Sequence, residues 1–232
     1  RHAEWDTLRR ELFGESFLPS GLAALLPDHW TVADLGCGTG PALVELAPVV
    51  RRVVGIDREP RMVEAARVRT ADLANVEVHH GGLEDLPLGD GEIDAATCML
   101  VLHHVADLVS VLREVRRVLR PDGRLVVIDM IAHDREDWAR AMGHHHLGFD
   151  AQTLSGRAAE AGLETTSLRA LAPATEAQGP PLFLAVLRPT DPRRQRAAGL
   201  PTLSDDTSLE DRGEGRTDLR TGSGLAAEPR TR

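Results

Sequence analysis

The chain has 232 residues, enough for one α/β domain with a substantial core, and 42% of them are hydrophobic. Its formal net charge of −9 excludes a polyanion-binding field over the whole chain, so we expect no nucleic acid contact through this domain. No apolar run reaches membrane-spanning length, no secretory signal opens the chain, and the two cysteines, Cys37 and Cys98, suit a reducing compartment. We therefore expect a cytoplasmic protein with no membrane partner.

The apolar pattern predicts strands that alternate with helices. Helical spacing runs through Arg1–Leu26, with Trp5 and Phe13 on one side, and we expect residues 1–30 to form a helical cap that covers the ligand. The strands expected next, in chain order, are Thr31–Leu35, Arg52–Ile56, Val76–His79, Ile93–Leu100, Leu125–Met130, Glu164–Leu171 and Pro181–Leu187. The helices expected between them are Pro41–Val50, Pro60–Ala74, Val105–Leu119 and Ala151–Ala161, and a turn is expected at Arg120–Arg124.

This order predicts an α/β fold with a doubly wound, Rossmann-like sheet of seven strands. The middle strands are apolar along their length, which is typical of parallel strands covered on both faces. The last two strands follow each other without a helix, so we expect antiparallel pairing at one edge. Residues 1–188 form the predicted domain. Residues 189–232 are polar and without periodicity, and we expect them to be a disordered tail.

The stretch "VADLGCGTG" predicts a ligand-binding loop after the first strand. Its glycines, Gly36, Gly38 and Gly40, have the spacing G-x-G-x-G, whereas the dinucleotide fingerprint is G-x-G-x-x-G. Asp34 lies two residues before the first glycine, where its carboxylate would repel a pyrophosphate and attract a cation. S-adenosylmethionine carries an ammonium and a sulfonium and no phosphate. The loop therefore favours S-adenosylmethionine as the cofactor.

Asp57 ends the second strand, about 20 residues beyond the first glycine, where an acidic side chain can bind ribose hydroxyls. NAD enzymes place an acid in the same way, so Asp57 alone does not separate the two cofactors. The alternative is that Asp57 caps the following helix.

Taken together, "VADLGCGTG", "VVGID", "LEDLPLGDGEIDAA", "LHHVAD" and "VLRPDGRLVVID" resemble a class I S-adenosylmethionine-dependent methyltransferase in order and spacing. The resemblance covers about Trp5 to Arg188. More narrowly, "HAEWD" and "HDREDWARAMGHHHLGF" resemble the methyltransferase domain fused behind ArsR-type winged-helix regulators. Those fusions carry a DNA-binding part upstream, so such a domain before Arg1 is left open.

The resemblance implies roles for matching positions. Residues of the glycine loop would hold the methionine end, Asp57 the ribose and Met62 the adenine, to which Leu83 would also offer its N–H. Many relatives have Asp where this chain has Gly82, and Glu84 or Asp85 is a candidate substitute. The expected cofactor-binding residues are Asp34, Gly36, Cys37, Gly38, Gly40, Asp57, Arg58, Met62, Leu83, Glu84, Cys98 and Met99.

The candidate catalytic residues follow the fifth predicted strand, whose end should lie beside the cofactor. They are Asp129, His133 and His144; His133 could act as a general base that Asp129 orients. The alternative is that Asp129 caps a helix and the histidines are structural. A metal site of His133 with His144–His146 is disfavoured, because adjacent histidines on a helix point in different directions, and we expect no metal.

The sequence thus predicts an S-adenosylmethionine-dependent methyltransferase that acts on a small-molecule acceptor. Two alternatives remain at this stage. One is a quinone or lipid methyltransferase, and the other is a non-catalytic domain that senses S-adenosylmethionine or S-adenosylhomocysteine for an ArsR-type regulator. The sequence names neither the acceptor nor the oligomeric state.

Overall fold

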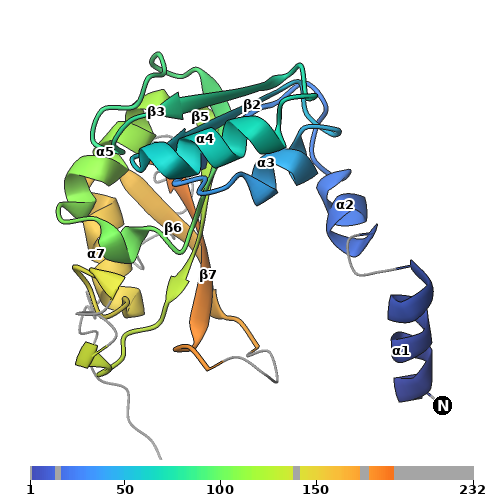
Figure 1. Cartoon of the computed structure of the whole chain (residues 1–232). Coiled ribbons are helices and arrows are strands. Elements are labelled where there is room, and N and C mark those ends of the chain that lie inside the picture. Colours follow the sequence, from blue (N-terminus) through green and yellow to red (C-terminus); the bar gives the residue numbers. More distant parts are fainter. Residues whose placement is uncertain (1, 14–16, 138–141, 173–177, 191–232) are drawn as a thin grey trace, which may run out of the picture.

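The computed structural model of the chain describes residues 2–13, 17–137, 142–172 and 178–190. Its centre is a seven-stranded sheet with the strand order β3-β2-β1-β4-β5-β7-β6 (Figure 1). The strands are β1 (Thr31–Leu35), β2 (Arg52–Asp57), β3 (Val76–His80), β4 (Ile93–Met99), β5 (Leu119–Met130), β6 (Leu163–Ala170) and β7 (Leu182–Pro189). The helices are α1 (His2–Phe13), α2 (Phe17–Ala23), α3 (Pro41–Leu46), α4 (Pro60–Arg69), the 3₁₀ turn η1 (Leu102–His104), α5 (Leu108–Val118) and α7 (Ala151–Glu160).

The predicted sheet is confirmed, including its mostly parallel character. β1 pairs in parallel with β2 and with β4, so the strand order reverses between β1 and β4. β7 is antiparallel to both β5 and β6. The antiparallel strand therefore lies one position in from the edge, and β6 is the edge strand itself. Because ligands of such sheets bind at the carboxyl ends of the strands where the order reverses, the site belongs beyond Leu35 and Met99.

Helices cover both faces of the sheet, as the apolar strands require (Figure 1). Neighbouring residues in one strand serve opposite faces: Val53 packs in a cluster with Leu43 of α3 and Ala66 of α4. Val54 belongs to the larger cluster, which includes residues of α5 and α7 such as Leu112. In the described part of the chain, no helix combines the length and apolarity that a membrane crossing needs.

Several elements end at other residues than predicted. α4 ends at Arg69: its C-cap Thr70 still donates its N–H to the Ala66 carbonyl at 2.9 Å, but its φ of −105° and ψ of 12° lie outside the helical region. The predicted turn at Arg120–Arg124 lies inside β5: Ile93 of β4 is opposite Leu119, and Ala95 is opposite Arg124. The Pro and Gly residues thus produce a break in pairing, not a separate turn.

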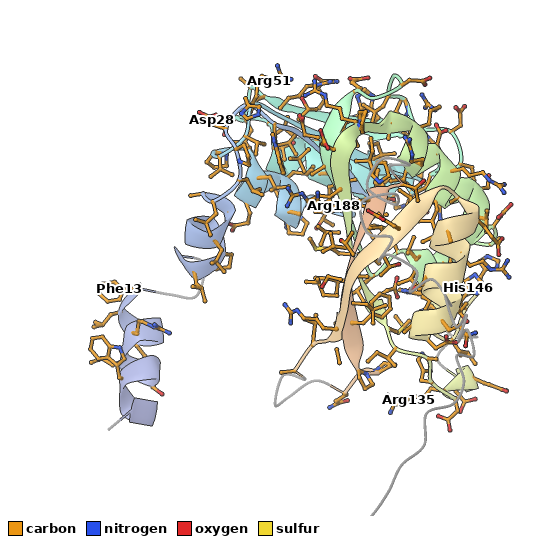
Figure 2. The ribbon with its side chains drawn as sticks, turned by 180° about the vertical axis from the view of Figure 1, so that it is seen from behind. Phe13, Asp28, Arg51, Arg135, His146 and Arg188 are labelled. Atoms are coloured by element: carbon orange, nitrogen blue, oxygen red, sulfur yellow. The ribbon has the colours of Figure 1, made fainter. Side chains whose placement is uncertain are left out.

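Two regions of the structure lie at the predicted domain boundaries. α1 lies well away from the sheet (Figure 1), and Figure 2 shows Phe13 far from Arg188 of β7. Trp5 and Phe13 are exposed, so a cover of the ligand by residues 1–30 stays a prediction. At the other end, Pro189 is a buried residue of β7, and Thr190 donates its N–H to the Gly162 carbonyl at 3.0 Å. The rest of the expected tail, residues 191–232, lies outside the described residues.

The chain after β5 returns to the end of that strand. Phe149 forms a parallel bridge with Ile131, and His133 donates its N–H to the Leu147 carbonyl at 2.9 Å. Gly148 permits this close approach: its φ is +76°, and a Cβ on it would lie 2.5 Å from the Ile131 carbonyl oxygen. The histidines that precede Leu147 are thereby held at the carboxyl edge of the sheet.

Gly148→Ala should destabilise the domain by about 2 kcal/mol or more, because the substitution combines a positive φ with a backbone clash. Gly156→Ala is the matched control, since Gly156 lies in α7 and a Cβ there meets nothing within 4 Å. That change should stabilise by about 0.5–1 kcal/mol through helix propensity. Urea unfolding measures both free energies. Equal effects of the two substitutions would contradict the close approach at Ile131.

Candidate functional site

The glycine loop forms a tight connection at the end of β1. Gly36 and Cys37 both donate their N–H groups to the Ile56 carbonyl of β2, at 2.8 and 3.0 Å. Gly36 has a φ of +72°, and a Cβ on it would lie 2.4 Å from a methyl carbon of Val101. Only glycine fits at this position. The loop is therefore packed between the end of β2 and the chain that leaves β4.

Asp34 places a carboxylate beneath this loop. It is 4% exposed, and the Thr97 hydroxyl of β4 donates to its Oδ1 at 2.6 Å. Burial raises the pKa of Asp34 from 3.8 to about 6, and the nearby charge of Asp57 adds to the effect, while the Thr97 hydrogen bond opposes it. Among the described residues Asp34 forms no ion pair. A cationic ligand would supply the missing partner.

Asp57 connects the glycine loop to the start of α4. Its Oδ2 accepts the Gly38 N–H at 2.8 Å, and its Oδ1 accepts the Glu59 N–H at 2.9 Å. The N-cap of α4 is Glu59, so Asp57 lies two residues before the cap and is not the cap itself. Each carboxylate oxygen still has a second lone pair for a ligand hydroxyl.

The residues predicted to contact adenine lie after β2 and β3. Arg58 and Met62 are exposed, Met62 by 41%, whereas Leu83 is buried. The Glu84 carboxylate folds back over Gly82, where a Cβ would lie 2.6 Å from its Oε2. An acidic group thus stands beside Gly82 although that position has no side chain.

The two cysteines are buried and unoxidised. Burial, together with the charges of Asp34 and Asp57, raises the pKa of Cys37 to about 12. Burial likewise raises the pKa of Cys98 well above the ordinary thiol value, and both Asp129 and Asp34 contribute. Both thiols are therefore neutral near pH 7, which suits small packing residues better than nucleophiles. Cys98 also lies between the two buried acids.

Asp129 is the second buried acid, with no exposed surface. Its Oδ1 lies 2.7 Å from Nδ1 of His103, which is itself buried in η1, and the same oxygen accepts the Met130 N–H at 2.7 Å. The prediction that Asp129 orients His133 is therefore wrong: its imidazole partner is His103. The alternative that Asp129 caps a helix has one contact in its favour: its Oδ2 accepts the backbone N–H of His103, in the 3₁₀ turn η1, at 3.4 Å.

His133 and His144 lie close to this pair. The Nδ1 of His133 accepts the Arg135 N–H at 3.1 Å, so the neutral ring carries its proton on Nε2, which is buried without a partner. Both ring nitrogens of His144 are buried without a partner in the described part of the chain. Burial lowers the pKa of His144, and the charges of His103, His104 and His133 lower it further. Figure 2 shows Arg135 and His146 at the same end of the molecule.

Three features of the site escaped sequence reasoning: the role of His103, the Thr97–Asp34 hydrogen bond, and the strained backbone of Leu100. Leu100 has a φ of +59° directly after β4, a conformation rare for leucine and frequent at functional sites. A signal for His103 did exist. A carboxylate inside an apolar strand needs a polar partner, and "LHH" follows the neighbouring strand.

The middle of the chain matches a known family: residues 33–127 match the methyltransferase domain. A 37.1 kDa uncharacterised protein in transposon Tn4556 of Streptomyces fradiae is 55% identical over 97 residues, which are 40% of this chain and 28% of that protein. The demethylmenaquinone methyltransferase of Listeria welshimeri is 37% identical over 112 residues, 46% of this chain and 48% of that enzyme. The chain thus matches half or less of these relatives' lengths.

Solved structures share the fold over a larger part of the chain. The YcgJ protein of Bacillus subtilis superposes with a TM-score of 0.62 at 20% identity, over 75% of this chain and 99% of that one. A geranyl diphosphate methyltransferase in complex with SAM gives 0.63 at 17% identity, over 74% of this chain and 85% of that one. The chain therefore shares the α/β fold of these solved structures, and residues 33–127 match the methyltransferase domain.

Asp34→Asn should stabilise the chain without ligand by about 1–3 kcal/mol at pH 7.5. The pKa of Asp34 is about 6 in the folded chain and near its ordinary 3.8 in the unfolded one, so the folded state binds the proton more tightly. Ionisation of Asp34 therefore lowers the free energy of unfolding as pH rises from about 4 to about 6. At higher pH the loss stays at its full value. The gain should vanish near pH 4.

Urea unfolding at the two pH values tests this prediction. Exposed Asp72 supplies the control: Asp72→Asn should change the free energy of unfolding little at either pH. A less stable Asp34→Asn at pH 7.5 would contradict a desolvated carboxylate at this position.

Proposed function

We propose that the chain is an S-adenosylmethionine-dependent methyltransferase that methylates a small-molecule acceptor. The observation that carries the proposal is Asp34, a buried carboxylate without an ion-pair partner among the described residues, beneath a glycine loop in a methyltransferase domain. The ammonium of the cofactor's methionine part supplies the partner. A pyrophosphate would instead meet the negative charges of both Asp34 and Asp57, which disfavours NAD at the same loop.

The cofactor extends along the carboxyl ends of β1, β2 and β4. Gly36, Cys37, Gly38 and Gly40 form the loop over the methionine end, while the free lone pairs of Asp57 accept the ribose hydroxyls. The adenine packs near Met62 and Arg58, with the Leu83 N–H and the Glu84 carboxylate beside Gly82 as its polar contacts. Cys98 and Met99 complete the methionine side at the end of β4.

Bound S-adenosylmethionine would supply an electrophilic methyl group, and the electron pair of its sulfur–methyl bond would return to sulfur on transfer. The acceptor atom supplies the pair for the new bond, and its proton leaves to solvent or to a base. The protein orients both partners and excludes water. This chemistry needs no strong base, so a site built mainly for positioning is sufficient.

Asp129, His133 and His144 line the acceptor side of the site. Asp129 is a positioning residue, because it holds His103 at the end of β4 through the 2.7 Å contact. In its neutral form His133 offers an Nε2 hydrogen to an acceptor oxygen or nitrogen, since its Nδ1 is occupied by the Arg135 N–H. His144 faces the same region with two nitrogens that have no protein partner among the described residues.

Two finer points belong to the same proposal. The likeness of "HDREDWARAMGHHHLGF" to ArsR-fused methyltransferase domains supports a relative of those domains that works in the cytoplasm. The names of several relatives specify demethylmenaquinone, so a hydroquinone belongs in any acceptor screen. We favour a small-molecule acceptor, and a quinone or lipid acceptor is the alternative.

Affinity for S-adenosylmethionine should fall about tenfold between pH 7 and pH 5, since a proton competes with the ammonium for Asp34, whose pKa is about 6. Isothermal titration calorimetry at both pH values measures this change, with S-adenosylhomocysteine as the stable ligand. Asp34→Asn should bind weakly at both pH values and lose the pH dependence. If the chain binds NAD and neither adenosyl ligand, the assignment of S-adenosylmethionine as the cofactor is wrong.

Transfer itself is tested with labelled S-adenosylmethionine and a panel of thiols, phenols, amines and a hydroquinone. For any acceptor found, His133→Ala should lower turnover about 10–100-fold with cofactor affinity unchanged, the usual cost of one hydrogen bond to a charged transition state. His133→Gln keeps an N–H donor and should restore most of the rate. Failure of Gln to restore a lost rate would make His133 a base; an unchanged rate in His133→Ala would remove it from the reaction.

Binding of both adenosyl ligands without transfer to any member of the panel would favour a sensor of the cofactor. That outcome would contradict the enzyme proposal while leaving the cofactor site intact.

A further inference from the structure

Three histidine rings meet at the carboxyl ends of β4 and β5. His103 and His104 come from η1, and His144 comes from the loop before Leu147. The ring centroids lie 4.2 Å apart for His103 and His104, 4.4 Å for His103 and His144, and 4.9 Å for His104 and His144. One nitrogen from each ring can be chosen so that all three lie within 4.8 Å of one another.

In two of these rings, Nδ1 faces an oxygen acceptor that orients the ring. Nδ1 of His103 faces the Asp129 carboxylate at 2.7 Å, and Nδ1 of His104 lies 3.3 Å from the Gly143 carbonyl. With the proton on Nδ1 in each ring, both Nε2 atoms carry a free lone pair. Metal-binding histidines have this arrangement, in which a carboxylate or carbonyl orients the ring by holding its other N–H.

The third ring lacks the partners that a purely structural histidine would have. Both Nδ1 and Nε2 of His144 are buried without a hydrogen bond in the described part of the chain. A buried unpaired nitrogen costs free energy, so this arrangement is unfavourable unless something else binds there. Its neighbour His146 differs, because its Nε2 lies 2.9 Å from the Val105 carbonyl.

The loop that carries His144 is itself held against η1. The N–H groups of His145 and His146 both donate to the His103 carbonyl, at 2.8 and 3.1 Å. Backbone hydrogen bonds therefore bring the three rings together, independently of any contact between the rings. The adjacent residues His103 and His104 both contribute because they lie in a tight 3₁₀ turn and not in an α-helix.

We propose that His103, His104 and His144 bind a divalent transition metal ion, with Zn²⁺ as the natural occupant. Imidazole nitrogen is a preferred Zn²⁺ ligand, and three protein ligands with an open fourth position are typical of reactive zinc sites. Tetrahedral Zn²⁺ at about 2.0–2.1 Å from each nitrogen needs the three nitrogens somewhat closer together. The half-buried His104 and the loop residue His144 have the freedom to close that gap.

This inference goes beyond the proposed function and does not depend on it, because metal binding requires neither cofactor nor methyl transfer. The histidine cluster lies next to the cofactor loop. Asp129, the partner of His103, and Asp34, beneath the loop, are both close enough to Cys98 for their charges to raise its pKa. The competing explanation is that the three neutral rings only pack edge to face, as aromatic groups do.

The test uses the untagged full chain, stripped with a chelator and then titrated with Co²⁺ and Zn²⁺. We expect one equivalent of Co²⁺ to produce the intense visible bands of a tetrahedral ion, and one equivalent of Zn²⁺ to abolish them. Calorimetry should give a 1:1 complex with Zn²⁺. Absence of both the bands and saturable Zn²⁺ binding would overturn the proposal and leave ring packing as the explanation.

Variants assign the ligands. His144→Gln should weaken Zn²⁺ binding at least 100-fold, and Asp129→Asn about 10–100-fold through loss of the orienting carboxylate. His29→Gln is the matched control, since His29 is an exposed histidine outside the cluster, and it should leave the affinity unchanged. If Asp129→Asn does not fold, as judged by circular dichroism, His144→Gln decides alone. Parent affinity in His144→Gln would overturn the assignment.

Discussion

The site depends on a carboxylate that the fold holds out of water. Asp34 is the second-last residue of the apolar strand β1, which lies between two parallel neighbours, and it is opposite Gly55 on β2 and Thr97 on β4. Its ionised form costs stability at neutral pH, and the Thr97 hydroxyl offsets only part of that cost. A residue that destabilises the empty protein is explained most simply by a ligand that needs it. The unpaired negative charge selects a cation at a loop that otherwise resembles a phosphate site.

A second buried acid, Asp129, lies near the same carboxyl ends of the strands. Asp129 holds His103 at the end of β4, and the loop that returns past Gly148 brings His144 beside it. The two acids serve different chemistry, because Asp34 is left without an ionic partner whereas Asp129 is committed to a histidine. Asp34 lies on β1 and Asp129 on β5, so β4 runs between them. Cys98 of β4 lies between the two carboxylates. The carboxyl ends of the central strands thus carry a cation site and a cluster of nitrogen ligands side by side.

Much of this arrangement could be predicted from the sequence, since it depends on local patterns. Apolar runs located the strands, and the positions of Asp34, Gly36 and Asp57 at strand ends predicted that these residues lie together, because the carboxyl ends of parallel strands meet on one side of the sheet. The break at Arg120–Arg124 was located correctly but interpreted as a turn, since Pro and Gly signal irregular backbone in either case.

The acceptor side could not be predicted in the same way. The Asp129–His103 contact joins residues 26 positions apart on different elements, and nothing local distinguishes it from the expected contact with His133. The ring cluster depends on a 3₁₀ turn and on the close approach at Gly148, neither of which has a sequence period. The insertion of β7 between β5 and β6 is likewise a matter of long-range pairing.

The most direct measurement of the central claim is a crystal structure of the chain with bound S-adenosylhomocysteine. The ammonium of the ligand should lie within hydrogen-bond distance of the Asp34 carboxylate, and the ribose hydroxyls should contact Asp57. A ligand bound elsewhere, or one whose ammonium faces away from Asp34, would contradict the role assigned to the buried carboxylate.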